Sequence, residues 1–149
     1  AGAAAPDGRS PANLDVASYV RVAVDGDAGA ARDALAREVS SYCALPAYAE
    51  HFARQGFGDG VAAIRSAYRE GGTEAAIDAV PEDMLLSLGW YGRPDEAPTD
   101  IVARYAAAGL DHLVVRVVVS GDDVTGAVER VLEALSRRPL PSRGSGGLE

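Results

Sequence analysis

The sequence predicts an α/β fold in which parallel strands alternate with helices. Residues 16–24 show a period of two, and residues 113–119 are almost continuously apolar, so both are expected to be strands. Stretches with the 3.6-residue apolar period of helices lie between and after them. Such alternation is typical of a parallel sheet, and a length of 149 residues favours one domain.

The first predicted strand, Val16–Val24, carries different side chains on its two faces. One face holds Val20, Val22 and Val24, and the other holds Tyr19, Arg21 and Ala23. The turn Asp25-Gly26-Asp27 provides an N-cap for a helix of about four turns. The apolar stripe of that helix consists of Leu35, Val39, Tyr42 and Cys43. Pro46 kinks or ends the helix.

Shorter helices are expected from there to residue 88. One spans 47–55 and stops at Gly56; the next spans 60–70, has Val61, Ile64 and Tyr68 on one side, and stops at Gly71-Gly72. Thr73 caps another short helix. Pro81 suits the first position of a helix over 81–88, because its missing N–H would be unpaired there anyway. Residues 89–91 are expected to form a short strand.

The last third of the chain is predicted to be helix, strand, helix. The first helix begins at Pro94-Asp95-Glu96 and closes at Gly109, with Ile101, Val102 and Tyr105 on its buried stripe. The strand is broken only by Arg116, so we expect both of its faces to be covered. Asp122 or Asp123 caps the final helix. Its apolar positions are Val124, Val128, Val131, Leu132 and Leu135.

Composition and charge exclude several function classes. The net charge of −8, with all 14 positive charges on arginine, argues against nucleic acid or an acidic membrane as a main partner. A single cysteine excludes an internal disulfide and fits a reducing compartment. No apolar run approaches the length of a membrane span, and residues 1–11 lack signal-peptide features, so a cytoplasmic location is expected.

Composition also divides the chain. Residues 1–13 look like the end of a preceding helix and a turn, and residues 14–138 are expected to fold. Residues 139–149 are rich in glycine, serine and proline and are expected to be a flexible tail derived from an expression vector.

Searches for catalytic motifs find no phosphate-binding loop, no dinucleotide glycine fingerprint, no nucleophile elbow and no zinc-protease motif. Cys43 lies on a helix's apolar stripe and is expected to be a buried structural thiol. His51 and His112 are too few for a metal site, so none is predicted.

Arg21 and Arg116 each interrupt an apolar strand. Strand alternation aims each at one face, where it binds an anionic substrate group. The commoner alternative is that it forms an internal ion pair or, on a face open to solvent, only adds to solubility. Trp90 and Tyr91 either stack on a flat ligand or fill the core.

Several segments in a characteristic order resemble the C-terminal part of the bacterial luciferase-like monooxygenase family, in particular its deazaflavin-dependent branch. They are Ala17–Val24, Leu45-Pro46-Ala47-Tyr48 with Phe52 and Gly56-Phe57, Val80–Leu85, Gly92–Glu96, Tyr105–Gly109 and Asp111–Val115. The resemblance covers about residues 14–135. Arg93 departs from it, since a small capping residue is usual there.

The resemblance implies the C-terminal portion of a (β/α)₈ barrel, with about three parallel strands, incomplete as a barrel by itself. It further implies an oxidoreductase or monooxygenase whose complete barrel uses FMN or a deazaflavin coenzyme on a small organic substrate. This chain would lack most of the cofactor site, so whether it binds a cofactor or acts as an enzyme by itself stays open. The partner would be the missing N-terminal barrel half or a second copy of this chain. The loops after the strands are the expected site. Its lining candidates are Arg21, Asp25, Trp90, Tyr91, Arg93, Arg116, Ser120 and Gly121.

A second hypothesis remains open at this point. The chain is then a stand-alone, non-catalytic α/β module that covers its open sheet edges by associating with itself or with a partner.

Overall fold

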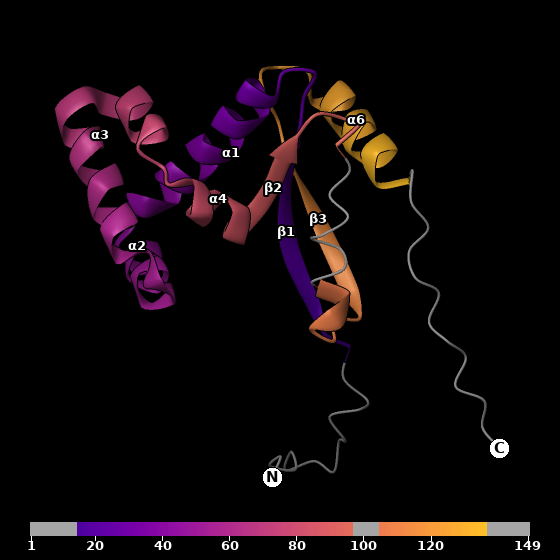
Figure 1. Ribbon diagram of the computed structural model, residues 1–149, viewed down its shortest axis with the longest axis horizontal. Coiled ribbons are helices and arrows are strands. Elements are labelled where there is room, and N and C mark those ends of the chain that lie inside the picture. Colours follow the sequence, from indigo (N-terminus) through magenta and orange to yellow (C-terminus); the bar gives the residue numbers. More distant parts are fainter. Residues whose placement is uncertain (1–14, 97–104, 137–149) are drawn as a thin grey trace, which may run out of the picture.

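The computed structural model describes residues 15–96 and 105–136, which form a three-stranded parallel sheet with helices on both faces (Figure 1). The elements in chain order are β1 (Ala17–Val24), α1 (Ala28–Cys43), α2 (Pro46–Phe52), the π-helical turn η2 (Ala53–Phe57), α3 (Gly58–Asp78), α4 (Glu82–Leu88), β2 (Gly89–Gly92), β3 (His112–Val118) and α6 (Val124–Ser136). The predicted α/β class with parallel strands in an open sheet is confirmed.

The strand order is β2-β1-β3, with β1 in the centre. Both pairings are parallel, and the register places Arg21 beside Arg116 and Val22 beside Trp90. Consecutive strands are neighbours in a closed (β/α)₈ barrel, whereas here β3 pairs with β1 rather than with β2. The sheet is open because, among the described residues, β2 and β3 form its two edges and do not pair with each other.

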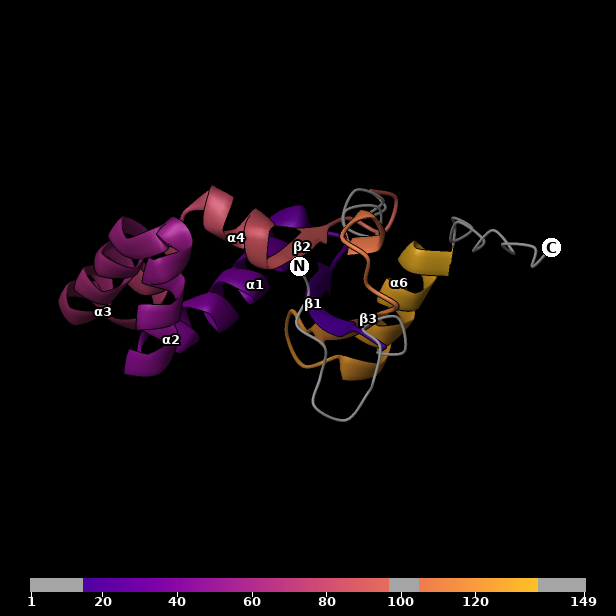
Figure 2. The same ribbon diagram turned by 90° about the horizontal axis from the view of Figure 1, so that it is seen from below.

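Figure 2 shows α1 and α4 on one side of the sheet and α6 on the other, and each face has its own core. On one face, Ala23 and Val118 pack with the apolar stripe of α1 and with residues of α3 and α4. On the other face, Val20, Val22 and Val24 pack against α6. The alternation of β1 assigns its side chains to the two cores, because successive residues of a strand point to opposite faces.

Strand β3 departs from the expectation that both of its faces are covered. Val114 and Arg116 are exposed on the face shared with Tyr19, which is 69 % exposed. Leu113, Val115 and Val117 on the opposite face contribute to the second core. The prediction of two covered faces was wrong because α1 covers this face only near the carboxyl ends of the strands, at Ala23 and Val118.

Helix α6 also differs from the predicted stripe. Ala127, Val131 and Ala134 face the sheet, whereas Val124, Val128 and Leu132 are exposed and Leu135 is half-buried. Alanine lets the helix approach the sheet closely, so the side that packs is the one with the smaller side chains.

The remaining helices follow the sequence signals with small shifts. Pro46 is the first residue of α2. Pro81 is the N-cap of α4, one position before the place expected for it, because its carbonyl accepts the first helical hydrogen bond from Leu85. Tyr68, expected on the buried side of α3, is 54 % exposed.

Parts of the predicted organisation lie outside the described residues. Residues 1–13 and 139–149 are among them, and so are Ile101 and Val102 of the helix predicted from Pro94. Residues 94–96 form a turn, and Tyr105 packs into the second core. Within the described parts, no helix is long and apolar enough to cross a membrane.

Candidate functional site

A cleft with a volume of about 570 Å³ opens where β1 and β3 end. Three of the predicted site residues, Asp25, Ser120 and Gly121, lie in its wall. The rest of the described lining comes from α1 and from the residue after β3: Ala30, Asp33, Ala34, Arg37 and Val119. Parallel strands present their carboxyl ends at one edge, so residues following β1 and β3 meet there although the sequence separates them.

Asp25 joins the ends of all three strands. Its backbone N–H donates to the carbonyl of Gly92 at the end of β2, over 3.2 Å. One carboxylate oxygen accepts the backbone N–H of Asp27 at 3.0 Å, and the other accepts the hydroxyl of Ser120 after β3. Asp25 therefore holds together the loops that follow the three strands, and it also lines the cleft.

The electrostatics of the loop keep Asp25 ionised. The hydrogen bond from the Asp27 N–H lowers the pKa of the Asp25 carboxyl below its usual value, and the Ser120 hydroxyl and the charge of Arg130 act in the same direction. Arg130 of α6 also donates to the carbonyl of Val24 at 3.3 Å and pairs with Asp123. Asp25 is thus a hydrogen-bond acceptor at neutral pH.

Aspartate side chains cap the helices that follow the loops after β1 and β3. Asp27 accepts the N–H of Gly29 at 2.9 Å and caps α1. Asp123 accepts the N–H of Gly126 at 2.9 Å and caps α6, which decides between the two predicted caps. Gly121 has a φ of +86°, a conformation that side chains with a Cβ rarely adopt.

Arg21 and Arg116 face the α1 side of the sheet and share one carboxylate. The Nε atoms of Arg21 and Arg116 lie 2.7 Å and 3.2 Å from Oε1 of Glu38 on α1. The guanidinium of Arg21 also lies 5.2 Å from the ring centroid of Tyr42. Among the described residues both arginines therefore pair with Glu38, although the Arg116 side chain is 53 % exposed, and neither lines the cleft.

Trp90 and Tyr91 point to opposite faces of β2. Trp90 packs into the second core, and Tyr91 packs against the first. The Tyr91 hydroxyl donates to Glu82 at 2.6 Å, and burial with this contact raises the pKa of Tyr91 to about 12. The two rings therefore do not form one stacking surface.

Arg93 is exposed at the turn after β2. Its N–H donates to the carboxylate of Glu96 at 3.0 Å, and the N–H of Glu96 donates to the Arg93 carbonyl at 3.0 Å. Glu96 thus makes the reciprocal half of a capping box, and its own N–H, which a small capping side chain would accept, is bound by the Arg93 carbonyl instead.

Asp33 and Arg37, both in the cleft wall, were missed by the sequence reasoning. They are four residues apart on α1, on the side away from the buried stripe, and that spacing was the available signal. Glu38 was missed as well, because nothing local to α1 shows that two strand arginines lie opposite it. Among residues 15–96 and 105–136, no group of three or more His, Cys, Asp or Glu side chains could hold a metal ion.

The sequence model of the luciferase-like monooxygenase family matches residues 1–112, about three quarters of the chain. It belongs to that family. The match begins before β1 and ends at the first residue of β3, so it includes Asp25 and stops short of Ser120. A comparison with curated proteins gives no match.

Members of this family are oxidoreductases that generally use flavin cofactors. The lining of the cleft offers groups that suit the ring of such a cofactor but not its phosphate. Asp25 and the Ser120 oxygen can accept hydrogen bonds from the polar edge of a ring, and Ala30 and Ala34 leave room for a flat surface. A phosphate does not fit this wall, since it holds two carboxylates and Arg37, which is already paired with Glu74 at 3.1 Å.

Proposed function

We propose that this chain forms part of a flavin- or deazaflavin-dependent monooxygenase that acts on a small organic substrate. Its contribution to the site is the cleft wall of Asp25, Ser120 and Gly121. The observation that carries the proposal is the position of these residues at the carboxyl ends of parallel strands, where sites of this architecture are built. Family membership supports the reaction class.

Asp25 is the central group of this wall. It accepts an N–H or O–H from the ring or the substrate, and the Ser120 hydroxyl and the Asp27 N–H hold it ionised and oriented. The bound flavin supplies the redox chemistry, and the protein positions it.

The cofactor's phosphate is held by residues outside the described cleft wall. The outer edges of β2 and β3 are both open in the described part of the chain, so further strands can pair there. We propose that a second copy of this chain, or the N-terminal half of the barrel, completes the site.

The test is size exclusion of the purified chain with light scattering and visible absorbance, after addition of FMN or of a deazaflavin. We expect the yellow cofactor to elute with an assembly larger than the single chain. A colourless species of this chain alone, with either cofactor, would overturn completion of the site by a second copy of this chain. It would favour the second candidate, a non-catalytic module that associates through its open edges.

Two substitutions in the cleft wall, with a matched control outside it, test whether this wall binds the cofactor. D25N and S120A are expected to weaken cofactor binding, measured by flavin fluorescence, by about tenfold, which corresponds to the loss of one charge-assisted hydrogen bond. D122N is the control, because Asp122 is an exposed acid of the same loop that does not line the cleft. Equal effects of D122N and D25N would contradict the assignment of this wall.

A further inference from the structure

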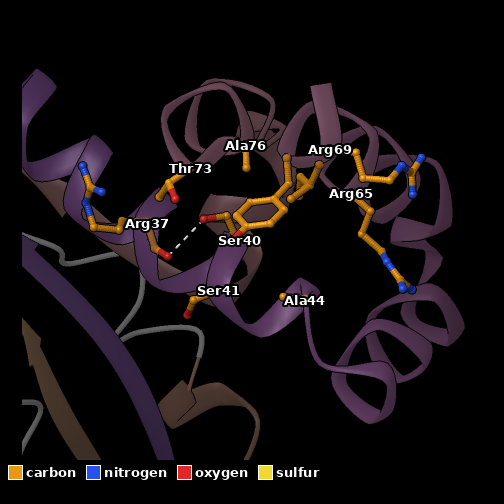
Figure 3. Close-up of a pocket in the computed structure, with 10 residues that line it drawn as sticks. Arg37, Ser40, Ser41, Ala44, Arg65, Arg69, Thr73 and Ala76 are labelled. Atoms are coloured by element: carbon orange, nitrogen blue, oxygen red, sulfur yellow. Dashed lines mark hydrogen bonds between the residues drawn. The ribbon is translucent and has the colours of Figure 1, made fainter. Parts of the chain in front are cut away.

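A pocket distinct from the cleft lies between α1 and α3 and has a volume of about 540 Å³ (Figure 3). Its apolar part includes Ile64 and Ala76, which are buried, together with Ala44. The remaining lining is polar or cationic and contains no carboxylate: Arg37, Ser40, Ser41, Arg65, Tyr68, Arg69 and Thr73. This composition is unusual in a chain with a net charge of −8.

The shape of the pocket depends on an interruption in α3. Gly72 has a φ of +76° and breaks the helix, so the segment that follows it takes a new direction. This segment carries Thr73 and Ala76, which line the pocket together with Ile64 and Arg65 from the segment before the break. The two parts of α3 and the carboxyl-terminal half of α1 thus form its walls.

The two α3 arginines of this pocket differ from the other arginines that the structure describes. Each of the others lies within 4.0 Å of a carboxylate. Arg65 and Arg69 form no ion pair with any described residue, and Arg69 only contacts the Ser66 hydroxyl, at 3.3 Å. They are four residues apart on one helix, so their like charges repel each other. An anion between them relieves that repulsion.

The other polar groups of the pocket show where its positive charge and its hydrogen-bond acceptors lie. Figure 3 shows Arg65 and Arg69 on one side of the pocket and Arg37 on the opposite side. Arg37 is paired with Glu74, so the net positive charge is at the Arg65–Arg69 rim. The Ser40 and Ser41 hydroxyls donate to the backbone carbonyls of Arg37 and Glu38, which leaves their oxygens as acceptors.

We propose that this pocket binds an organic phosphate monoester, with the phosphate between Arg65 and Arg69 and the apolar body against Ile64 and Ala76. Two guanidinium groups match the double negative charge of a phosphate, and each can donate two hydrogen bonds to it. The pocket shares Arg37 with the cleft, but the proposed phosphate lies at the opposite rim, so this proposal does not depend on the proposed redox function.

Phenyl phosphate is the probe, followed by calorimetry and by amide chemical shifts of the full chain. Inorganic phosphate tests the anion alone, phenol tests the apolar body alone, and benzoate tests a singly charged anion of similar shape. We expect saturable binding of phenyl phosphate, about tenfold or more tighter than binding of any of the other three. Shifts are expected at Thr73 and Ala76 and not at Ser120.

R65Q and R69Q are each expected to weaken phenyl phosphate binding by about tenfold, and the double variant more. R54Q is the control, since it removes the same charge from an exposed arginine outside the pocket. These arginines are exposed, so the variants should retain the circular dichroism of the parent chain. Failure of phenyl phosphate to saturate, equal binding by R65Q/R69Q and R54Q, or tighter binding of benzoate would each overturn the proposal.

Discussion

The Ser120 hydroxyl donates a hydrogen bond to the Asp25 carboxylate and thereby joins residues 95 positions apart in the sequence. It holds the loop after β3 against the loop after β1. Since Asp25 also binds the end of β2 through its backbone, this contact stabilises the whole carboxyl edge of the sheet.

Removal of the Ser120 hydroxyl is expected to lower the free energy of unfolding. S120A deletes one hydrogen bond to a charged group that is partly open to solvent, so we expect a loss of about 1 kcal/mol. Urea unfolding at pH 7 measures it. S66A is the control, because the Ser66 hydroxyl also donates to a carboxylate but does so within one exposed helix. An equal loss in both variants would contradict a specific role for the loop contact.

The stabilisation from Asp25 should depend on pH. The folded state lowers the pKa of its carboxyl from 3.8, so folding favours the ionised form. The contribution is therefore fully present above the unfolded-state pKa and disappears as the pH falls through the folded-state pKa. The difference in unfolding free energy between the parent chain and D25N should be largest near pH 7 and should decrease progressively as the pH falls below about 3.8. A difference that is independent of pH would contradict this account.

Loss of the Glu38 carboxylate should be more damaging than loss of an exposed acid. E38Q leaves Arg21 and Arg116 as neighbours in register with no shared anion, and the Glu38 side chain is only 14 % exposed. We expect a loss of about 2 kcal/mol in urea unfolding, partly recovered in E38Q/R116Q. E129Q, at an exposed position of α6, should change the stability by less than about 0.5 kcal/mol.

The single cysteine should be unreactive in the folded chain. Cys43 is fully buried on α1, and burial raises the pKa of its thiol to about 11. A thiol reagent at pH 8 should modify it only as fast as the chain unfolds, and immediately in denaturant. Rapid modification of the folded chain would contradict the burial of this side chain.

Short-range signals in the sequence set the local elements of this protein. The alternation of β1, the caps of α1 and α6 and the breaks at Pro46 and Gly72 are signals carried by residues within a few positions of each other. Each sets the backbone conformation or satisfies a nearby hydrogen bond. For this reason the α/β class and the order along the chain of the strands and of the helices α1, α4 and α6 could be predicted.

The tertiary structure decided the contacts between these elements. Strand order, the shared carboxylate of Glu38, the separation of Trp90 from Tyr91 and the outward-facing side of α6 all depend on which surfaces meet across long sequence separations. The same holds for the candidate site, where the sequence named Asp25, Ser120 and Gly121 but not Asp33 or Arg37. Local periodicity shows which face of an element is apolar, whereas only packing decides what that face, or the opposite one, contacts.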